Sequence, residues 1–309
     1  MNLNPSNQLI LFGHHTEFQN FSNLFLNQKL PNKILLSGEK GIGKSTLAYH
    51  LVNYVLSSDE DLSYDIKNFV INPENKSFKL SQNKSNPNFI SIDINDDKKS
   101  IDVNQIRNLI ITLNKSSFNK KPRFVLIDNI ELLNINSVNA LLKILEEPND
   151  NIYFILINNN KKILPTLKSR CLNFKIQLSS SQSFDITNQI LNDNFMNLIN
   201  EDLINYYSTP GKILNLLDFA NQNDLDLKEI NLKDLIKKII MEKKYKKDPS
   251  IKYLLYSLIE IYFRKNISIK NTKLINIHNY FLKKINNTKI FNLDDESLLM
   301  EFDERVLDG

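Results

Sequence analysis

One short segment limits what this chain can fold into more than any other. It reads Gly38-Glu39-Lys40-Gly41-Ile42-Gly43-Lys44-Ser45-Thr46 and fits the pattern G-x-x-x-x-G-K-S/T. An apolar run at 34–36 precedes it, and apolar residues follow it at helical spacing, at 47, 48, 51, 52 and 55. Strand, glycine-rich turn and helix is the order in which such a loop binds phosphate. The segment therefore predicts an α/β domain with a parallel sheet.

The use of glycine supports this interpretation. Three of the six glycines of the 309-residue chain, Gly38, Gly41 and Gly43, lie in this segment. Glycine is needed where the backbone takes a positive φ or where a ligand approaches the main chain closely. In loops of this kind the lysine reaches the outer phosphates and the hydroxyl holds Mg²⁺. We therefore expect residues 38–46 to bind a nucleotide, through Lys44 and Ser45, rather than to form an accidental turn.

A second apolar run, 124–127, ends in a carboxylate at Asp128. Ligands of α/β sheets bind at the carboxyl ends of the parallel strands. Asp128 is therefore predicted to hold Mg²⁺ together with Ser45. The alternative is a carboxylate that only caps the helix after the strand.

Two further segments carry a resemblance to a known family. They read Asn139-Ala140-Leu141-Leu142-Lys143-Ile144-Leu145-Glu146-Glu147-Pro148 and Ser169-Arg170-Cys171. In this order, after the loop and the acidic strand, they resemble subunits of the bacterial DNA polymerase III clamp loader, which are AAA+ ATPases. The resemblance covers about residues 10–178, and within the family it is greatest to the delta-prime class.

The resemblance implies an architecture and a set of partners. It implies an AAA+ nucleotide-binding domain over 1–178, a small helical lid over 179–222 and an all-helical collar for oligomerisation over 223–309. It also implies a hetero-oligomer with gamma/tau and delta subunits, which uses ATP and Mg²⁺ to place the sliding clamp on primed DNA. The Ser-rich stretch 179–183 is typical of a linker at the first boundary.

Arg170 is one of only five arginines among 39 basic residues. A guanidinium offers a planar fork and a permanent charge, which lysine does not. In the family, the arginine of this segment is a finger that reaches the γ-phosphate held by a neighbouring subunit. The alternative is a local ion pair with a carboxylate.

The chain departs from active AAA+ members at the residue after Asp128. Those members have a glutamate there that activates water, whereas this chain has Asn129, which cannot accept a proton. Glu131 lies two positions too late to replace it. We expect weak hydrolysis by this subunit. An ATP-hydrolysing gamma/tau-type motor, a nucleotide-free AAA+ scaffold, and an AAA+ chaperone or initiator remain alternatives.

Two more residues occupy positions where the family senses phosphate. Asn158 follows the apolar run 152–157, and Lys212 ends the segment Ser208-Thr209-Pro210-Gly211-Lys212. Lysine there lacks the bidentate reach of arginine. Because the chain is rich in asparagine, Asn158 is equally well explained by chance.

Helix 137–148 is expected to be packed in the core. Its apolar positions 138, 141, 142 and 145 share one face, Ser137 is a candidate N-cap, and Pro148 ends the run. The segment 139–148 can thus be a signature of packing rather than of chemistry. The interval 57–99 is polar and, with Cys171 as the only cysteine, is expected to be a surface insert without zinc.

Composition excludes other classes. No apolar run approaches the roughly 20 residues that a membrane-spanning helix needs, and the polar N-terminus lacks a signal pattern. We expect a cytoplasmic protein with no membrane partner. The net charge of +4 permits nucleic-acid binding without requiring it. The lysine-rich stretch 237–247 could contact DNA, but it is interpreted mainly as a solvated helix face and linker.

Overall fold

The computed structural model describes residues 3–95, 98, 100–115, 119–146, 151–246, 248–266, 272–291 and 293–307. By its contacts the chain divides into two compact units. The first comprises Met1–Ile190 and the short segment Thr209–Gly211. The second comprises Leu191–Ser208 and Lys212–Gly309. The finer division into lid and collar stays a prediction.

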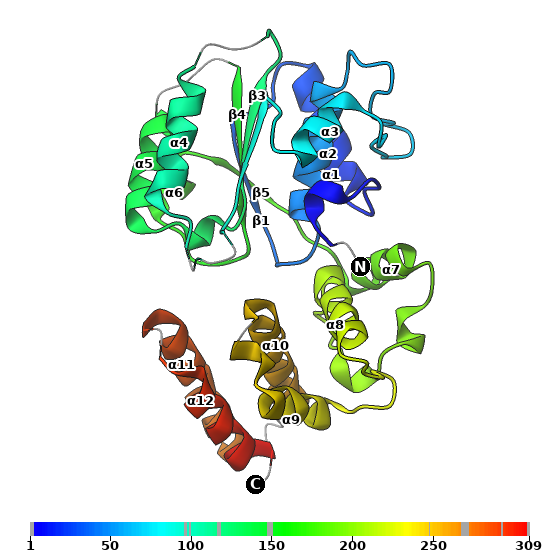
Figure 1. Cartoon of the computed structure of the whole chain (residues 1–309), viewed down its shortest axis with the longest axis vertical. Coiled ribbons are helices and arrows are strands. Elements are labelled where there is room, and N and C mark those ends of the chain that lie inside the picture. Colours follow the sequence, from blue (N-terminus) through cyan, green and yellow to red (C-terminus); the bar gives the residue numbers. More distant parts are fainter. Residues whose placement is uncertain are drawn as a thin grey trace. The chain divides into compact units, whose positions relative to one another are not determined.

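A five-stranded sheet forms the centre of the first unit (Figure 1). Its strands are β1 (Lys33–Ser37), β2 (Phe89–Ile92), β3 (Arg123–Ile127), β4 (Ile152–Asn158) and β5 (Leu172–Lys175). Their order is β2-β3-β4-β1-β5, and every neighbouring pair is parallel. All carboxyl ends therefore lie at one edge. The predicted α/β fold with a parallel sheet is confirmed.

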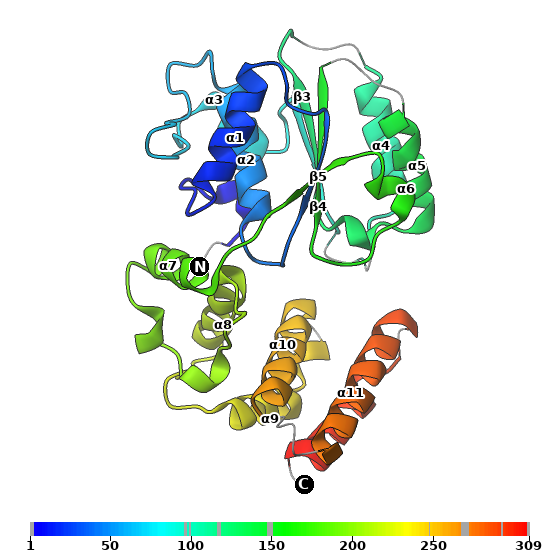
Figure 2. The same ribbon diagram turned by 180° about the vertical axis from the view of Figure 1, so that it is seen from behind.

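Helices cover both faces of this sheet (Figures 1 and 2). One face carries α1 (His15–Leu26), α2 (Lys44–Leu56) and α3 (Lys76–Gln82); the other carries α4 (Val103–Leu113), α5 (Ile135–Glu146) and α6 (Pro165–Lys168). Short 3₁₀ turns, η1 (Pro5–Asn7) and η2 (Ile130–Leu132), complete the layers, and α7 (Ser180–Leu191) follows β5. Side chains of β1 alternate between two cores: Ile34 and Leu36 pack on the α2 side, and Leu35 on the α5 side.

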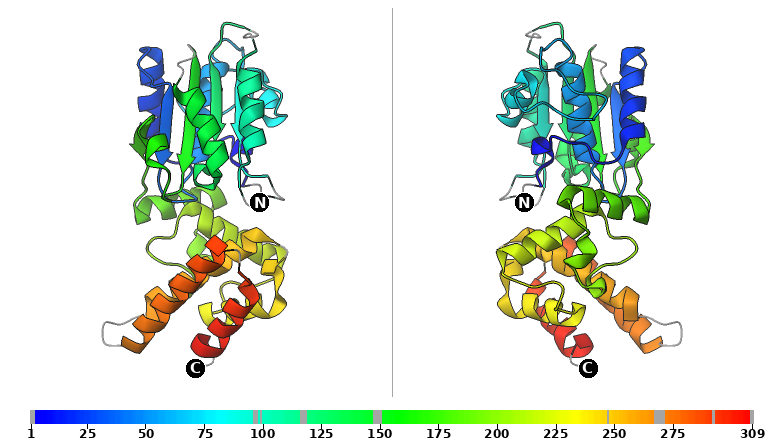
Figure 3. Two further views of the ribbon diagram at one scale, coloured as in Figure 1. Left: turned by 90° about the vertical axis from the view of Figure 1, so that its left-hand side faces the viewer. Right: turned by 90° about the vertical axis from the view of Figure 1, so that its right-hand side faces the viewer.

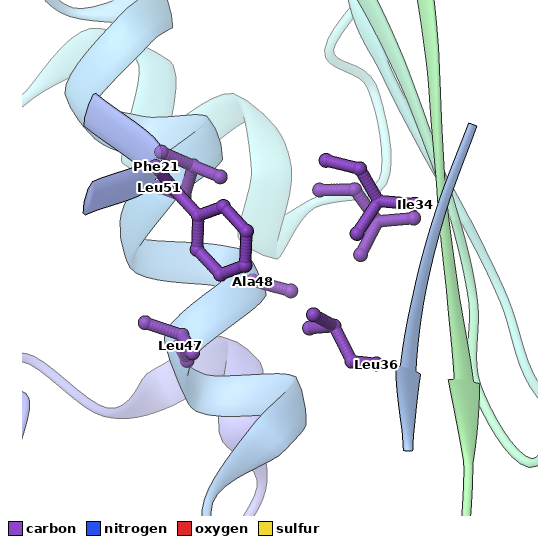
Figure 4. Close-up of a pocket in the computed structure, with 7 residues that line it drawn as sticks. Phe21, Ile34, Leu36, Leu47, Ala48 and Leu51 are labelled. Carbon is purple, nitrogen blue, oxygen red and sulfur yellow. The ribbon is translucent and has the colours of Figure 1, made fainter. Parts of the chain in front are cut away.

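Helix α2 forms where the helical spacing of apolar residues predicted it, and most of its surface is buried. Its positions 47, 48, 51, 52 and 55 are all buried. A cavity of about 10 Å³ lies between α1, α2 and the sheet, and Figure 4 shows its lining. The lining side chains are all apolar, and the space suffices for no more than one water molecule. This cavity is a packing detail of the core, so the functional site has to be sought at the sheet edge.

The prediction of Ser137 as the N-cap of this helix is wrong. Helix α5 begins at Ile135, and the buried Ser137 does not cap it. Instead the Ser137 hydroxyl donates to the carbonyl of Ile101, at 2.8 Å, and the Asn134 side chain accepts from the Ser137 N–H, at 2.9 Å. The expected apolar face is present, because 138, 141 and 145 are buried. Pro148 lies outside the described residues.

The Ser-rich stretch is not a linker, because α7 begins there. Ser179 and Gln182 form a reciprocal cap: the Ser179 N–H donates to Gln182 Oε1, at 2.8 Å, and the Gln182 N–H donates to Ser179 Oγ, at 3.2 Å. Such a capping box satisfies two otherwise unpaired N–H groups at a helix start. The pattern S-x-x-Q in the sequence carried this signal.

The interval 57–99 is also more than a surface insert. It contains α3 and β2, and it contributes Tyr64, Ile71 and Phe78 to the buried core. The Tyr64 ring stacks on Phe18, with centroids 5.1 Å apart. Sparse aromatic residues in a polar stretch thus anchor it to the domain. The absence of zinc from this interval stays a prediction.

The second unit is helical (Figures 2 and 3). Its helices are the later part of α8 (Pro210–Gln222), α9 (Leu232–Glu242), α10 (Pro249–Asn266), α11 (Thr272–Phe291) and α12 (Asp295–Phe302), with the turns η3 (Phe195–Asn197), η4 (Glu201–Leu203), η5 (Lys244–Lys246) and η6 (Asp303–Leu307). Rings of Phe263, Phe281 and Phe302 join three helices, with centroids 5.3 to 6.2 Å apart. Among the described residues no helix has the length and apolar character needed to cross a bilayer.

The lysine-rich stretch of the second unit is partly paired. Lys243 and Lys246 both contact Glu296, at 2.6 and 2.5 Å. Lys244 contacts Glu242 at 2.8 Å. Lys243 and Lys246 thus bind a carboxylate of α12, so this part of the stretch is more than a solvated helix face.

Candidate functional site

The predicted phosphate-binding loop connects β1 to α2 at the carboxyl edge of the sheet. Gly41 and Gly43 have φ values of +85° and +91°, a region that L side chains rarely adopt. Gly43 precedes the first residue of α2. Strands β3 and β4 lie beside β1, so Asp128 and the residues after β4 reach the same edge.

Each carbonyl of the loop from Gly38 to Ile42 accepts a hydrogen bond. The Lys44 ammonium donates to the carbonyls of Gly38 and Glu39, at 2.9 and 2.6 Å. The other three carbonyls take donors from distant segments: Thr209 Oγ1 for Lys40 at 2.9 Å, the Gly211 N–H for Gly41 at 2.8 Å, and His14 Nε2 for Ile42 at 2.6 Å. The loop is therefore fixed by contacts from both ends of the first unit.

These contacts orient the N–H groups of the loop. In a trans peptide the C=O and the following N–H point in opposite directions. The N–H groups of Gly41, Ile42 and Gly43 are therefore turned away from Thr209, Gly211 and His14. Successive backbone N–H groups in such a turn can form a concave site that suits an anion.

The donor role of His14 follows from its surroundings. Burial lowers the pKa of His14 and favours the neutral ring. A carbonyl oxygen can only accept, so Nε2 carries the hydrogen in the contact with Ile42.

Lys44 is buried, with 3% of its surface exposed. Burial lowers the pKa of Lys44 to about 8, and the nearby carboxylates of Asp128, Glu131 and Glu39 oppose this shift. Its third hydrogen bond goes to Asn159 Oδ1, at 3.0 Å. The ammonium thus has three acceptors, and an incoming phosphate must replace some of them.

Ser45 and Asp128 are brought together as predicted, since the Ser45 hydroxyl donates to an Asp128 carboxylate oxygen. Burial raises the pKa of Asp128, and the Ser45 hydrogen bond opposes that rise. A hydroxyl and a carboxylate are oxygen ligands of the kind Mg²⁺ prefers, with water and phosphate oxygens completing its shell. The residues present therefore fit the metal.

Lys40 is exposed on the loop, and Thr46 is half-buried in the first turn of α2.

The structure corrects the prediction for Asn158. Its side chain folds onto the following turn: Nδ2 donates to the carbonyl of Lys161, at 3.0 Å, and Oδ1 accepts from the Lys161 N–H, at 3.1 Å. Strand β4 includes Asn158, and side chains alternate along a strand, so the next residue takes the other side. Asn159 is the residue that contacts Lys44.

The sequence analysis missed a hydrogen-bonded network behind Lys44. Asn159 Nδ2 donates to Asn129 Oδ1, at 2.8 Å, and to Glu131 Oε1, at 2.9 Å. Asn129 Nδ2 donates in turn to Asp93 Oδ1, at 2.7 Å. Asp93 and Glu131 thus lie around the position of the missing glutamate. Asp93 follows β2 and Glu131 lies in η2, and no sequence motif marks either residue.

Arg170 forms a local ion pair, which the sequence analysis gave as the alternative to an arginine finger. Its guanidinium contacts the Glu146 carboxylate, with Nε at 3.1 Å, and donates from the opposite side to the carbonyl of Thr166, at 2.9 Å. Among the described contacts of Arg170, none involves residues 38–46.

Burial raises the pKa of Cys171 to about 11, which disfavours a reactive thiolate. Lys212 belongs to the second unit.

Comparison with known proteins supports the resemblance. A family model described as DNA polymerase III, delta subunit, matches residues 13–180. The chain is 34% identical over 218 residues to DNA polymerase III subunit gamma of Buchnera aphidicola subsp. Schizaphis graminum, covering 67% of this chain and 57% of the relative.

The chain is also similar to proteins named DNA polymerase III subunit delta'. That of Buchnera aphidicola subsp. Baizongia pistaciae is 34% identical over 148 residues, covering 46% of this chain and 42% of the relative. That of Buchnera aphidicola subsp. Schizaphis graminum is 28% identical over 276 residues, covering 84% and 80%. The first two matches span about half the length of these relatives. Because the family model matches more than half of the chain, the chain belongs to the DNA polymerase III delta-subunit family, a family of AAA+ clamp-loader subunits.

Proposed function

We propose that this chain works as a delta-prime-like subunit of a DNA polymerase III clamp loader in the cytoplasm. With gamma/tau and delta subunits it supports ATP-dependent loading of the sliding clamp onto primed DNA. The family match over 13–180 and the relatives named delta' support this proposal. Residues 179–222 and 223–309 are in this view the lid and the oligomerisation collar, with Lys212 as the lid residue that contacts phosphate.

The loop 38–46 binds ATP with Mg²⁺ in this proposal. The observation that carries it is the set of loop carbonyls held by outside donors, which orients three successive N–H groups for an anion. When ATP binds, the Lys44 ammonium moves from the Gly38 and Glu39 carbonyls to the outer phosphates. Thr46 lies at the start of α2. Mg²⁺, held by Ser45 and Asp128, neutralises phosphate charge.

Hydrolysis by the chain alone is weak in this proposal. Asn129 occupies the position where a base is needed, and both ends of its amide are engaged, by Asp93 and by Asn159. Glu131 accepts two hydrogen bonds from Asn159, so its carboxylate is directed toward that residue. A missing general base typically costs about 10²- to 10⁴-fold in rate.

Arg170 acts on a neighbour's nucleotide in this proposal. Its partner Glu146 has 54% of its side chain exposed, and exposed ion pairs contribute at most about 1 kcal/mol. The guanidinium therefore exchanges the carboxylate for a phosphate at little cost when a neighbouring subunit presents one.

A gamma/tau-type motor subunit is the second candidate, because one relative at 34% identity is a gamma subunit. Equilibrium binding of Mg-ADP and Mg-ATP to the purified chain, followed by steady-state ATP turnover, separates the candidates. The proposal expects binding with slow turnover. Fast turnover by the pure chain favours the motor, and no binding at all favours a nucleotide-free scaffold.

A further inference from the structure

We infer that Thr209, together with Gly211, positions the phosphate-binding loop from its outer side, so that the Gly41 and Ile42 N–H groups face the phosphates. Thr209 is thus a positioning residue for nucleotide binding, although it lies 163 residues beyond the loop's end at Thr46 in the sequence. The inference rests on the proposed nucleotide binding of residues 38–46.

The segment Thr209–Gly211, at the start of α8, lies close to the loop. Thr209 is 3% exposed, and its hydroxyl donates to the Lys40 carbonyl at 2.9 Å. The Gly211 N–H donates to the Gly41 carbonyl at 2.8 Å. By its contacts the segment Thr209–Gly211 belongs to the first unit, while the chain on both sides of it belongs to the second.

Two glycines make this approach possible. A Cβ on Gly211 would lie 2.7 Å from the Cα of Gly41, and a Cβ on Gly41 would lie 2.7 Å from Thr209 Oγ1. Real Cβ atoms essentially never come so close to other atoms. Gly211 is the only glycine between Gly43 and Gly309 in a chain with six glycines. The backbone contact therefore explains why this position has no side chain.

The segment Thr209–Gly211 holds the loop through groups that a nucleotide does not bind. Lys44 fixes the Gly38 and Glu39 carbonyls, but its ammonium is the group that phosphate recruits. When Lys44 engages phosphate, those two contacts weaken. The Thr209 hydroxyl and the Gly211 N–H keep their partners, so they maintain the orientation of the Gly41 and Ile42 N–H groups in the bound state.

A hydroxyl deletion tests this role. Thr209→Val keeps the shape of the side chain and removes the donor, whereas Thr209→Ser keeps the donor. Thr187 provides a matched control, because it is also buried and its hydroxyl donates to a carbonyl, that of Ser183, at 2.8 Å. Thr187→Val thus removes a comparable hydrogen bond inside α7.

We expect Thr209→Val to weaken Mg-ADP binding by about five- to tenfold in calorimetry, the scale of one hydrogen bond. Thr209→Ser should bind within about twofold of wild type. Thr187→Val should lower the melting temperature about as much as Thr209→Val, with unchanged affinity. Wild-type affinity in Thr209→Val, or equal weakening in Thr187→Val, overturns the inference.

Amide hydrogen exchange without nucleotide separates this inference from the proposed function. Thr209→Val should speed exchange in the peptide covering 38–43, and Thr187→Val should not. If the wild type binds no nucleotide, the proposed function fails, and faster exchange in Thr209→Val still supports the ordering of the loop. Unchanged exchange in Thr209→Val contradicts the inference whatever the nucleotide result.

Discussion

The Lys44 ammonium cannot hold the loop carbonyls and contact phosphate at the same time. Without ligand, its buried ammonium donates to two loop carbonyls and to Asn159. With ATP, the same group has to face phosphate oxygens. Burial that lowers the pKa of Lys44 to about 8 makes a phosphate, with its negative charge, a better partner than neutral carbonyls.

Replacing Lys44 with alanine should weaken binding of Mg-ATP by at least about tenfold, or about 1.4 kcal/mol. The cation aimed at the outer phosphates is lost, and so are its contacts with Gly38 and Glu39. Lys40→Ala is the matched control, since Lys40 is an exposed cation of the same loop. Calorimetric titration of both variants measures the difference, and unchanged affinity in Lys44→Ala would show that the nucleotide binds elsewhere.

The environment of Asn129 predicts how a base can be restored. In Asn129→Glu the new carboxylate faces Asp93, and two like charges at short range disfavour ionisation. We expect little turnover from this single variant. Adding Asp93→Asn supplies an amide partner and should raise steady-state ATP turnover of the purified chain at least about tenfold over the single variant. Equal rates in the two variants, or wild-type turnover as fast as that of the pair, would refute this account of Asn129.

At the scale of elements, α2 links the loop to the core and carries a buried histidine. His50 is fully buried, and its Nδ1 lies 2.9 Å from the Tyr64 hydroxyl. Burial lowers the pKa of His50 from 6.5 to about 4. Between these two values the unfolded chain binds a proton that the folded chain does not.

Stability should therefore fall as pH drops below about 6.5, by about 2 kcal/mol at pH 5 through this group. In His50→Gln this share of the pH dependence should vanish, although His14, whose pKa is also lowered, keeps a smaller effect of the same sign. Urea unfolding followed by circular dichroism at pH 7.5 and pH 5 checks it. The same pH dependence in both proteins would mean that His50 is not responsible.

Elements whose signal is local were predictable from the sequence. The strand–loop–helix unit around Lys44 and the acidic strand before Asp128 need only periodicity and glycine placement. The Asn158 assignment failed because strand β4 ends one residue later than its apolar run, and one residue reverses the side of a strand. The spacing of Ser179 and Gln182 predicts the start of α7, but the serine-rich composition of the stretch favoured a linker.

At the scale of the whole molecule, the site depends on contacts between segments distant in the chain. His14, the loop and Thr209 meet only after folding, so periodicity and motif spacing could not reveal the donors of the Lys40 and Ile42 carbonyls. The contributions of Asp93 and Asn159 depend in the same way on the order of strands in the sheet. The proposed role of Arg170 cannot be read from one chain, because an arginine finger acts on the nucleotide of a neighbouring subunit.

The complex reconstituted with gamma/tau and delta subunits tests the central claim most directly, through its ATP turnover stimulated by the sliding clamp and primed DNA. Arg170→Ala should leave the chain's own nucleotide binding intact. It should slow the neighbouring site by on the order of 10³-fold, and Arg170→Lys should fail similarly because it lacks the fork. Glu146→Gln, which breaks only the local ion pair, should keep the wild-type rate. A wild-type rate with Arg170→Ala, or an equal loss with Glu146→Gln, would contradict the role of this chain as a delta-prime-like subunit that completes its neighbour's site.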